Sequence, residues 1–351
     1  MKIEKSELAT KLSMVKSIVP KQTPLAAIQG VLIEEGYLIA NNMETAAKVK
    51  IEADTERPFI IPDKAFNLIS SLPDGEIEIT PGDGYIMIKA GKVKNRFTTR
   101  NGSDFQRPNI EKSEDSKSFV IKAEDFLRSV KRVAFAIGDD SRVNTLCLRA
   151  KDGSLNYIGL DGHIVAWDKM DYEGEFELLI PKNTVSKLLS IGLSGDMTIE
   201  YTNNSALFIT EECEVSTRLA NGAFFDVNKM LSTGTHHTTI QKSSMVEALN
   251  RIKMLISDDK QPVKFSFSKD SVNISMRNTI TDYNEDISLV KDIEEDLTIA
   301  FNPRLLNECM KAMESEEVNM VFTGAKAPLT MRTDGSEFLT VILPVNLGGA
   351  A

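Results

Sequence analysis

The sequence predicts an α+β fold built from three tandem repeats, because one pattern of helix and strand signals recurs at offsets of 118 and 119 residues. Segments that begin at Ile3, Ile121 and Ile240 each run from one apolar residue through a polar stretch into an apolar stripe. A stripe spaced by three and four residues is typical of an amphipathic helix, and early polar or acidic residues such as Ser6 and Glu124 suit its first turn. We therefore expect helices over residues 3–19, 121–137 and 240–256.

A second helix signal follows in each repeat, directly after a short apolar strand. It lies around Pro62, Pro181 and Asn302, at offsets of 119 and 121 residues, and predicts helices over 63–72, 182–193 and 303–313. Alternating stretches such as EIEIT, YIMIKA, TLCLRA, MTIEYT, VKFSFS and VNMVFT lie between the helices and are separated by Gly, Asn and Asp turn residues. Each repeat should thus hold two helices and about eight short strands.

The 351 residues divide into three domains of ordinary size. We expect boundaries at 1–115, 116–232 and 233–351. Two arrangements stay open at this point. The domains could work independently, or their sheets could continue from one repeat to the next with all helices on one side.

The compartment is predicted from apolar runs and cysteines. No stretch approaches 18 apolar residues, and the N-terminus MKIEKSELATKLSMVKSIV intersperses Lys and Glu among its apolar positions. The three cysteines, Cys147, Cys213 and Cys309, are widely spaced in apolar segments, which favours buried thiols over disulfides or zinc. We expect a cytoplasmic protein with no membrane segment.

The charge is unevenly distributed along the chain. A net charge of −10 argues against nucleic-acid binding only if the charge is evenly spread. The six expected helices contain fifteen Lys or Arg and seven Asp or Glu, a balance of +8, which leaves −18 for the remainder. A basic helical face is often only a solvated surface, but six helices that together form a basic layer without interleaved aromatic residues suit contacts to phosphates.

Twelve basic residues on these helices or in the loops that follow them are therefore the candidates for facing DNA. They are Lys11, Lys16, Lys21, Arg128, Lys131, Arg132, Arg142, Lys187, Arg251, Lys253, Arg304 and Lys311.

Three motifs carry a resemblance to a known family. They are LDGHIVAW at 160–167, NGAFFDV at 221–227 and VILPVNL at 341–347. They are similar to the motifs T-D-G-H-R-L-A, D-G-R-F-P-D-Y and V-x-M-P-x-R-L. Together with the three repeats, they resemble the bacterial-type replicative sliding clamp, the beta subunit of DNA polymerase III, over the whole chain.

The resemblance implies a DNA-clamp fold in each repeat and a head-to-tail homodimer that closes a ring, with helices lining the inner face and sheets outside. The expected function is that of a processivity factor that encircles double-stranded DNA without sequence specificity. The implied partners are the replicative DNA polymerase, an ATP-dependent clamp loader and other proteins that carry a clamp-binding motif. The implied dimer interface comprises Arg96, Phe97, Thr99, Met254 and Leu255.

The resemblance also implies a pocket between the second and third domains that binds client peptides. The matching positions are Val143, Leu160, Gly162, His163, Ile164, Val165, Phe225, Met230, Pro328, Val341, Leu343, Pro344, Val345, Asn346 and Leu347. Ile164 and Asn346 replace arginines of the family pattern and Phe225 replaces a proline. These replacements predict a more apolar pocket.

Catalysis is the less favoured class of function. Asp161-Gly162-His163 and His236-His237 could suggest acid–base or metal chemistry, but the sequence has no H-E-x-x-H, G-x-S-x-G or Gly-rich phosphate loop. We expect His163 in a turn, the His236-His237 pair in a solvated linker, and neither a cofactor nor a metal. A repeat scaffold that binds only proteins, without encircling DNA, is the alternative function.

Overall fold

The computed structural model describes the chain except residues 109–114, 232–233, 257–260, 280 and 347–351. Its described part contains six α-helices and twenty-four β-strands. The chain divides into two compact units. Unit 1 consists of Met1–Arg128 with Asn183–Asn221, and unit 2 consists of Ser129–Lys182 with Gly222–Ala351.

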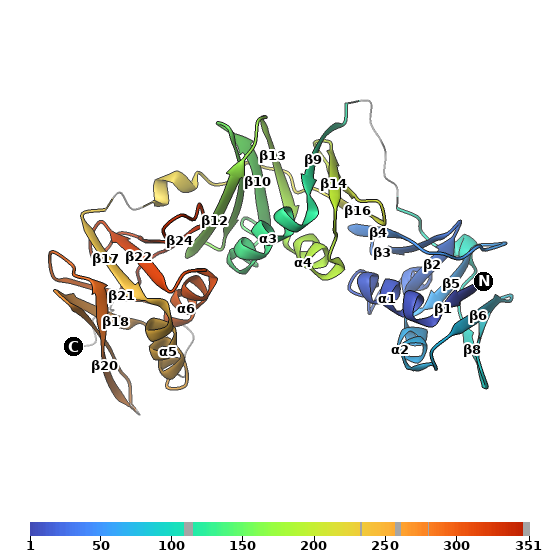
Figure 1. Cartoon of the computed structure of the whole chain (residues 1–351), viewed down its shortest axis with the longest axis horizontal. Coiled ribbons are helices and arrows are strands. Elements are labelled where there is room, and N and C mark those ends of the chain that lie inside the picture. Colours follow the sequence, from blue (N-terminus) through green and yellow to red (C-terminus); the bar gives the residue numbers. More distant parts are fainter. Residues whose placement is uncertain (109–114, 232–233, 257–260, 280, 347–351) are drawn as a thin grey trace. The chain divides into compact units, whose positions relative to one another are not determined.

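The three predicted repeats each contribute two helices and eight strands, so the α+β prediction is confirmed (Figure 1). The first repeat contains β1 (Lys2–Glu4), α1 (Lys5–Val15), β2 (Gly30–Glu34), β3 (Tyr37–Asn41), β4 (Thr45–Lys50), β5 (Phe59–Pro62), α2 (Asp63–Ser71), β6 (Glu76–Pro81), β7 (Tyr85–Ala90) and β8 (Val93–Thr98). The second contains β9 (Lys117–Lys122), α3 (Ala123–Val133), β10 (Thr145–Lys151), β11 (Ser154–Leu160), β12 (Ile164–Asp171), β13 (Phe176–Pro181), α4 (Lys182–Ile191), β14 (Asp196–Tyr201), β15 (Ser205–Ile209) and β16 (Cys213–Arg218). The third contains β17 (His236–Gln241), α5 (Lys242–Lys253), β18 (Val263–Ser268), β19 (Ser271–Arg277), β20 (Asp282–Lys291), β21 (Leu297–Phe301), α6 (Pro303–Ala312), β22 (Glu317–Phe322), β23 (Leu329–Arg332) and β24 (Leu339–Ile342).

The sheets continue from one repeat to the next, as one of the two open arrangements predicted. In unit 1 the order β5-β2-β3-β4-β16-β15-β14-β9 forms one sheet, and β1-β6-β7-β8 forms another. In unit 2 the order is β13-β10-β11-β12-β24-β23-β22-β17-β20-β19-β18-β21. The antiparallel pairs β4–β16 and β12–β24 therefore join consecutive repeats, the fourth strand of one to the eighth strand of the next.

Helices α1, α2, α5 and α6 pack on strands of their own unit. In unit 1, α1 contacts α2, β1 and β3, and in unit 2, α5 and α6 lie side by side, with α5 against β17 and β20 and α6 against β24 (Figure 1). The stripe of α5 buries Met245, Ala248, Leu249 and Ile252. Burial of each large apolar side chain contributes about 1.5–3 kcal/mol, so this face fixes the helix on its sheet.

Local signals set the helix starts, with two departures from the sequence prediction. Asn302 caps α6 by accepting hydrogen bonds from the amides of Arg304 and Leu305, and Pro303 occupies the first helical position. The apolar residues that open the three long helix signals are instead the next-to-last residues of strands β1, β9 and β17, so each helix starts two residues later than expected. His236 and His237 lie in β17 and pair with β22, so the prediction of a solvated linker there is wrong.

The three cysteines are free and buried. None of the described helices is long and apolar enough to cross a membrane.

Candidate functional site

The walls of the predicted peptide pocket meet where β12 and β24 pair in unit 2. The register places Ile164 opposite Ile342 and Val165 opposite Val341. Past the end of the ladder, the amide of Leu343 donates to the carbonyl of His163 over 2.8 Å. Residues 160–165 and 341–345, which lie far apart in the sequence, are thus brought to one junction of the sheet.

A tight turn before β12 presents His163. The Asp161 carboxylate accepts hydrogen bonds from the amides of His163 and Ile164, both at 2.7 Å, and Gly162 between them has a φ of 92°. Glycine adopts this left-handed conformation without the strain that a side chain would bring. The prediction of a turn at His163 is confirmed, and its imidazole is exposed.

Gly138 fixes the loop after α3 against this turn. Its amide donates to the carbonyls of Val143 and Leu160, each at 3.1 Å. A Cβ at Gly138 would lie 2.6 Å from a Val143 methyl group, closer than real side chains approach, and 3.0 Å from the Asp161 Cα. The absence of a side chain at Gly138 therefore lets Val143 lie close to the Asp161–Ile164 turn.

The predicted pocket residues divide by exposure into a buried group, named the floor, and an accessible group, named the rim. The floor consists of Val143, Leu160, Ile164, Val165 and Val341, all at most 8% exposed. The rim consists of the exposed Gly162, His163 and Asn346 and the half-buried Pro328, Leu343, Pro344 and Val345. An apolar floor with a partly polar rim can hold the apolar side chains of an extended peptide. Leu347 lies outside the described residues.

Two further predicted pocket residues lie on the segment between β16 and β17. Phe225 is 62% exposed and Met230 is half-buried. The Asp226 carboxylate accepts from the amide of Asn228 and caps the short helical turn Val227–Met230. The segment thus offers an exposed aromatic ring, which a partner could bury.

Sequence reasoning missed an ion pair between Arg132 and Asp168, which holds α3 against β12. Arg132 of α3 donates to both carboxylate oxygens of Asp168, at 3.2 Å each, and also pairs with Glu314. The Asp168 side chain is only 4% exposed and that of Arg132 is 16% exposed. The prediction that Arg132 faces DNA is therefore wrong, because its guanidinium is committed to a buried ion pair. The only sequence signal was the carboxylate of Asp168 directly after the apolar run Ile164–Trp167.

Four other predicted DNA-facing cations already pair with carboxylates. They are Lys11 with Glu212, Arg128 with Asp125, Arg142 with Asp140, and Arg251 with Glu285. Hydrogen bonds from Arg142 lower the pKa of the Asp140 carboxyl to about 2. A phosphate would have to compete with these carboxylates for the cations.

The position of Lys187 also differs from the prediction that it faces DNA. It lies on the buried face of α4 and is 9% exposed, so its side chain does not stand out on the surface as predicted. Burial lowers the pKa of its ammonium, and the neighbouring Glu44 carboxylate raises it by a smaller amount. Lys187 thus belongs to the packing of unit 1.

The remaining cations are better placed for phosphate contacts. Lys16, Lys21, Lys131 and Lys311 are exposed and Lys253 is half-buried, and none has a carboxylate partner in the part of the chain that the structure covers. Lys16 donates to the side-chain oxygen of Asn67 at 3.3 Å. Arg304 is half-buried.

The predicted dimer residues lie on the edge strand β8 of unit 1 and directly after helix α5 of unit 2. In unit 1, Arg96 and Phe97 belong to β8, which pairs only with β7 among the described strands, and the Arg96 guanidinium stacks on Tyr85 at 3.9 Å. Thr99 follows β8 and is half-buried. In unit 2, Met254 and Leu255 end α5 and are 83% and 37% exposed.

The site offers binding surfaces and carries no cluster with metal-ligand character. Among the residues described, no group of three His, Cys, Asp or Glu could hold a metal ion.

Comparison with known proteins adds the family context. Residues 232–346 match the family model of the DNA polymerase III beta subunit, C-terminal domain. The beta sliding clamp of Rickettsia felis is 23% identical over 376 residues, which covers 98% of this chain and 99% of that protein. The beta sliding clamp of Streptococcus pneumoniae is 25% identical over 295 residues, which covers 80% and 77%.

Solved structures give the same result for the fold. A putative DNA polymerase III beta subunit from Eubacterium rectale has a TM-score of 0.89 at 25% identity and covers 98% of this chain and 99% of its own. The DNA polymerase III beta subunit of Thermotoga maritima has a TM-score of 0.90 at 22% identity, with 99% of both chains covered.

The chain therefore has the fold of the DNA polymerase sliding clamps. Residues 232–346 match the model of the C-terminal domain of the DNA polymerase III beta subunit, and the whole chain resembles the bacterial beta sliding clamps along almost its full length.

Proposed function

We propose that this chain is a processivity factor: two copies close head to tail around double-stranded DNA and tether a replicative DNA polymerase. The observation that carries the proposal is the threefold repetition of one supersecondary unit, with consecutive repeats joined through the same two strands. A ring built from such repeats needs no sequence-specific contacts, since topology alone keeps it on the duplex.

The strand topology supports closure by a second copy. The fourth strand of each repeat pairs with the eighth strand of the next, which leaves β20 and β8 without this partner among the described strands. β8 is an edge strand, and the ladder between β20 and β17 involves only Leu289 and Lys291 at the end of β20. A second copy can supply the missing pair, β20 of one copy against β8 of the other. Such a heterologous contact closes a ring when the rotation between copies permits, and it removes the open edges.

The charges of the two edges are complementary. Around β8 the chain carries Lys92, Lys94, Arg96 and Arg100, and β20 carries Asp282, Glu285 and Asp286. Opposite potentials steer association and fix which edges meet. The exposed Met254 and Leu255 near β20 add apolar surface to the same contact.

Sequence-independent DNA contact is the role proposed for the unpaired lysines Lys16, Lys21, Lys131, Lys253 and Lys311. Lysine side chains that meet phosphates release counterions and carry no base information. Weak, exchangeable contacts of this kind let a ring slide.

The pocket at the β12–β24 junction is proposed to bind the clamp-binding peptides of the polymerase and of other clients. Its buried apolar floor and half-open rim fit apolar anchors, and the exposed Phe225 can cover the bound segment. In this proposal the protein is a non-catalytic, cytoplasmic accessory subunit that an ATP-dependent loader places on DNA.

The test combines mass in solution with retention on DNA. Light scattering should give a dimer near twice 38.9 kDa. After loading with a cognate loader and ATP, the protein should stay on circular DNA and slide off linear DNA. A concentration-independent monomer with no preference for circles would refute the ring and favour a protein-binding scaffold.

A further inference from the structure

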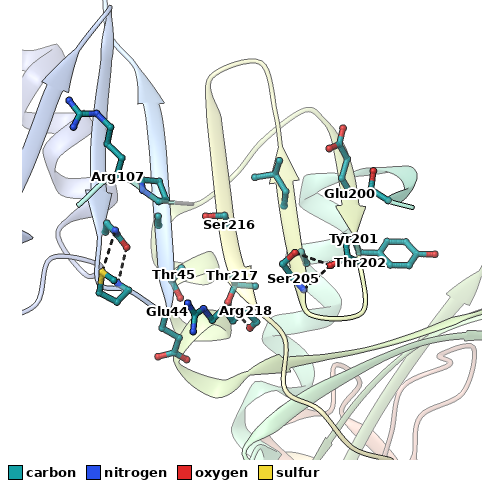
Figure 2. Close-up of a pocket in the computed structure, with 17 residues that line it drawn as sticks. Glu44, Thr45, Arg107, Glu200, Tyr201, Thr202, Ser205, Ser216, Thr217 and Arg218 are labelled. Carbon is teal, nitrogen blue, oxygen red and sulfur yellow. Dashed lines mark hydrogen bonds between the residues drawn. The ribbon is translucent and has the colours of Figure 1, made fainter. Parts of the chain in front are cut away.

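Unit 1 contains a pocket at the junction of β4 and β16 that the proposed function does not use. Its cavity measures about 160 Å³, and its walls come from β4, β14, β15 and β16 together with Arg107 and Pro108 (Figure 2). Both the strands and the covering residues belong to the same compact unit.

The backbone of this junction repeats that of the proposed client pocket. The Asn42 side chain accepts from the amides of Glu44 and Thr45 at 3.1 and 2.8 Å, as Asp161 does from the two amides that follow its turn. The amide of Arg218 donates to the carbonyl of Glu44 at 3.2 Å, as that of Leu343 does to His163.

The register extends this equivalence to the pocket lining. Ala46 faces Ser216 across β4 and β16, as Val165 faces Val341 across β12 and β24. Counting from these pairs, six residues of the client pocket have counterparts that line the cavity in unit 1. The counterparts of Leu160, His163, Ile164, Val165, Val341 and Leu343 are Asn41, Glu44, Thr45, Ala46, Ser216 and Arg218.

The counterparts differ in chemistry, because apolar positions have become polar. Thr45 and Thr217 each share a hydrogen bond with the Thr184 hydroxyl, at 3.0 and 2.7 Å, which fixes the junction with hydroxyls in place of Ile164 and Ile342. The buried Asn41 donates to the carbonyl of Gln106 at 2.6 Å and holds the covering segment on the sheet. A fully apolar anchor would leave such groups poorly matched.

One positive charge in the lining, that of Arg218, takes part in no ion pair that the described residues show. Arg107 is held by both carboxylate oxygens of Glu34, at 3.0 and 2.6 Å, and Glu44 lies near the buried Lys187. Arg218 is exposed and forms no ion pair with any residue that the structure describes. Its guanidinium lies at the rim of the pocket, beside Glu44 (Figure 2).

We propose that this pocket is a second peptide-binding site, which takes an extended segment with an acidic side chain that pairs with Arg218. The assignment rests on the proposed function in one respect, namely that the equivalent junction in unit 2 binds peptides. Its polar lining selects a different class of segment from the apolar anchors of the client pocket, so the two junctions would not compete for one ligand.

The experiment is a selection of phage-displayed random dodecapeptides on the full-length protein in which Leu343→Glu closes the client pocket. Recovered peptides are synthesised with fluorescein, and their affinity is measured by anisotropy for the wild type and for Arg218→Glu, Arg218→Lys and Ser216→Trp. Thermal melting checks that each variant folds. Arg218 is exposed, so its substitutions leave the core intact.

The expected peptides carry Asp or Glu and bind about tenfold more weakly to Arg218→Glu, while Arg218→Lys retains most of the affinity. Failure to recover any peptide, or binding that neither Arg218→Glu nor Ser216→Trp weakens, would overturn the second site. A separate measurement with a peptide that carries Gln and apolar anchors tests the client pocket through Leu343→Glu, so the two proposals can fail independently.

Discussion

Arg132 and Asp168 form a buried ion pair in which one guanidinium nitrogen lies 3.2 Å from both carboxylate oxygens. The Arg132 guanidinium also lies over the Phe338 ring, 5.2 Å from the ring centroid. Phe338 is the residue directly before β24. The pair thus ties α3 to β12 and to the start of β24. Val165 and Val341, in the floor of the proposed client pocket, are on these same two strands.

Arg132→Met should destabilise the protein and weaken the client pocket together. Removing one partner of a buried pair leaves the other charge uncompensated, which costs about 3–5 kcal/mol. We expect a loss of this size in chemical denaturation and weaker binding of a client-type peptide. Adding Asp168→Asn should recover part of the stability, because it removes the unpaired carboxylate.

The matched control is Arg128→Met, on the same helix. Arg128 pairs with Asp125 at the surface, where such a pair contributes at most about 1 kcal/mol. Peptide affinity should then be unchanged. If Arg132→Met lowered DNA retention but left peptide affinity intact, the assignment to the pocket would be wrong.

Lys187→Met should raise stability at neutral pH. Burial lowers the pKa of Lys187 from its ordinary value of 10.5, so the folded state holds this proton less tightly than the unfolded state. The charged lysine is therefore a cost below its folded pKa, and the cost fades as the pH rises toward 10.5. We expect a gain of about 1 kcal/mol at neutral pH that shrinks in alkaline solution. Urea denaturation at several pH values measures it, and a loss of stability at neutral pH would contradict it.

The repeats were predictable because helix and strand periods depend on local sequence. The stripes that begin near Leu8, Phe126 and Met245 predicted the existence of α1, α3 and α5, although each helix starts two residues later and ends three or four residues earlier than expected. Each strand pattern that was singled out also proved to be a strand. The histidines of β17 were misjudged, since polar strand residues next to Gly and Thr resemble a linker in sequence.

The candidate site was less predictable because it depends on contacts between distant segments. A basic residue on a helix has the same sequence signal whether it meets solvent, as Lys131 does, or a buried carboxylate, as Arg132 does. Only the fold brings Asp168 to α3. The second junction pocket was likewise hidden, because its lining shares the position but not the chemistry of the family motif at Asp161–Val165.

DNA binding should depend on the lysines without carboxylate partners. Replacing Lys21, Lys131, Lys253 and Lys311 together by Gln should lower the affinity for duplex DNA and make this affinity less sensitive to salt. The slope of the logarithm of the binding constant against the logarithm of the salt concentration should fall in magnitude by up to about 0.9 for each phosphate that is no longer neutralised by a lysine. Arg142→Gln with Arg128→Gln serves as the control, since both arginines already pair with carboxylates and should matter less. An unchanged slope in the quadruple variant would remove these lysines from the DNA-binding surface.

The three thiols should be unreactive in the folded protein. Burial raises the pKa of Cys147 and of Cys213 to about 12 and also raises that of Cys309. Since the thiolate is the nucleophile, a raised pKa keeps each group neutral at mildly alkaline pH. We expect no alkylation by iodoacetamide in native buffer and alkylation of all three in urea, read by mass spectrometry. Labelling of any one in native buffer would mean that its segment opens.

The proposed interface between β8 and β20 should respond to charge reversal in a way that only a head-to-tail dimer allows. Lys94→Glu with Arg96→Glu places like charges opposite β20, and Asp282→Lys with Asp286→Lys does the same opposite β8, so each variant alone should be a monomer by light scattering. An equimolar mixture should form dimers, because one interface then joins the two reversed edges and the other joins the two native edges. A mixture that stays monomeric would exclude this pairing, and so would a single variant that still dimerises.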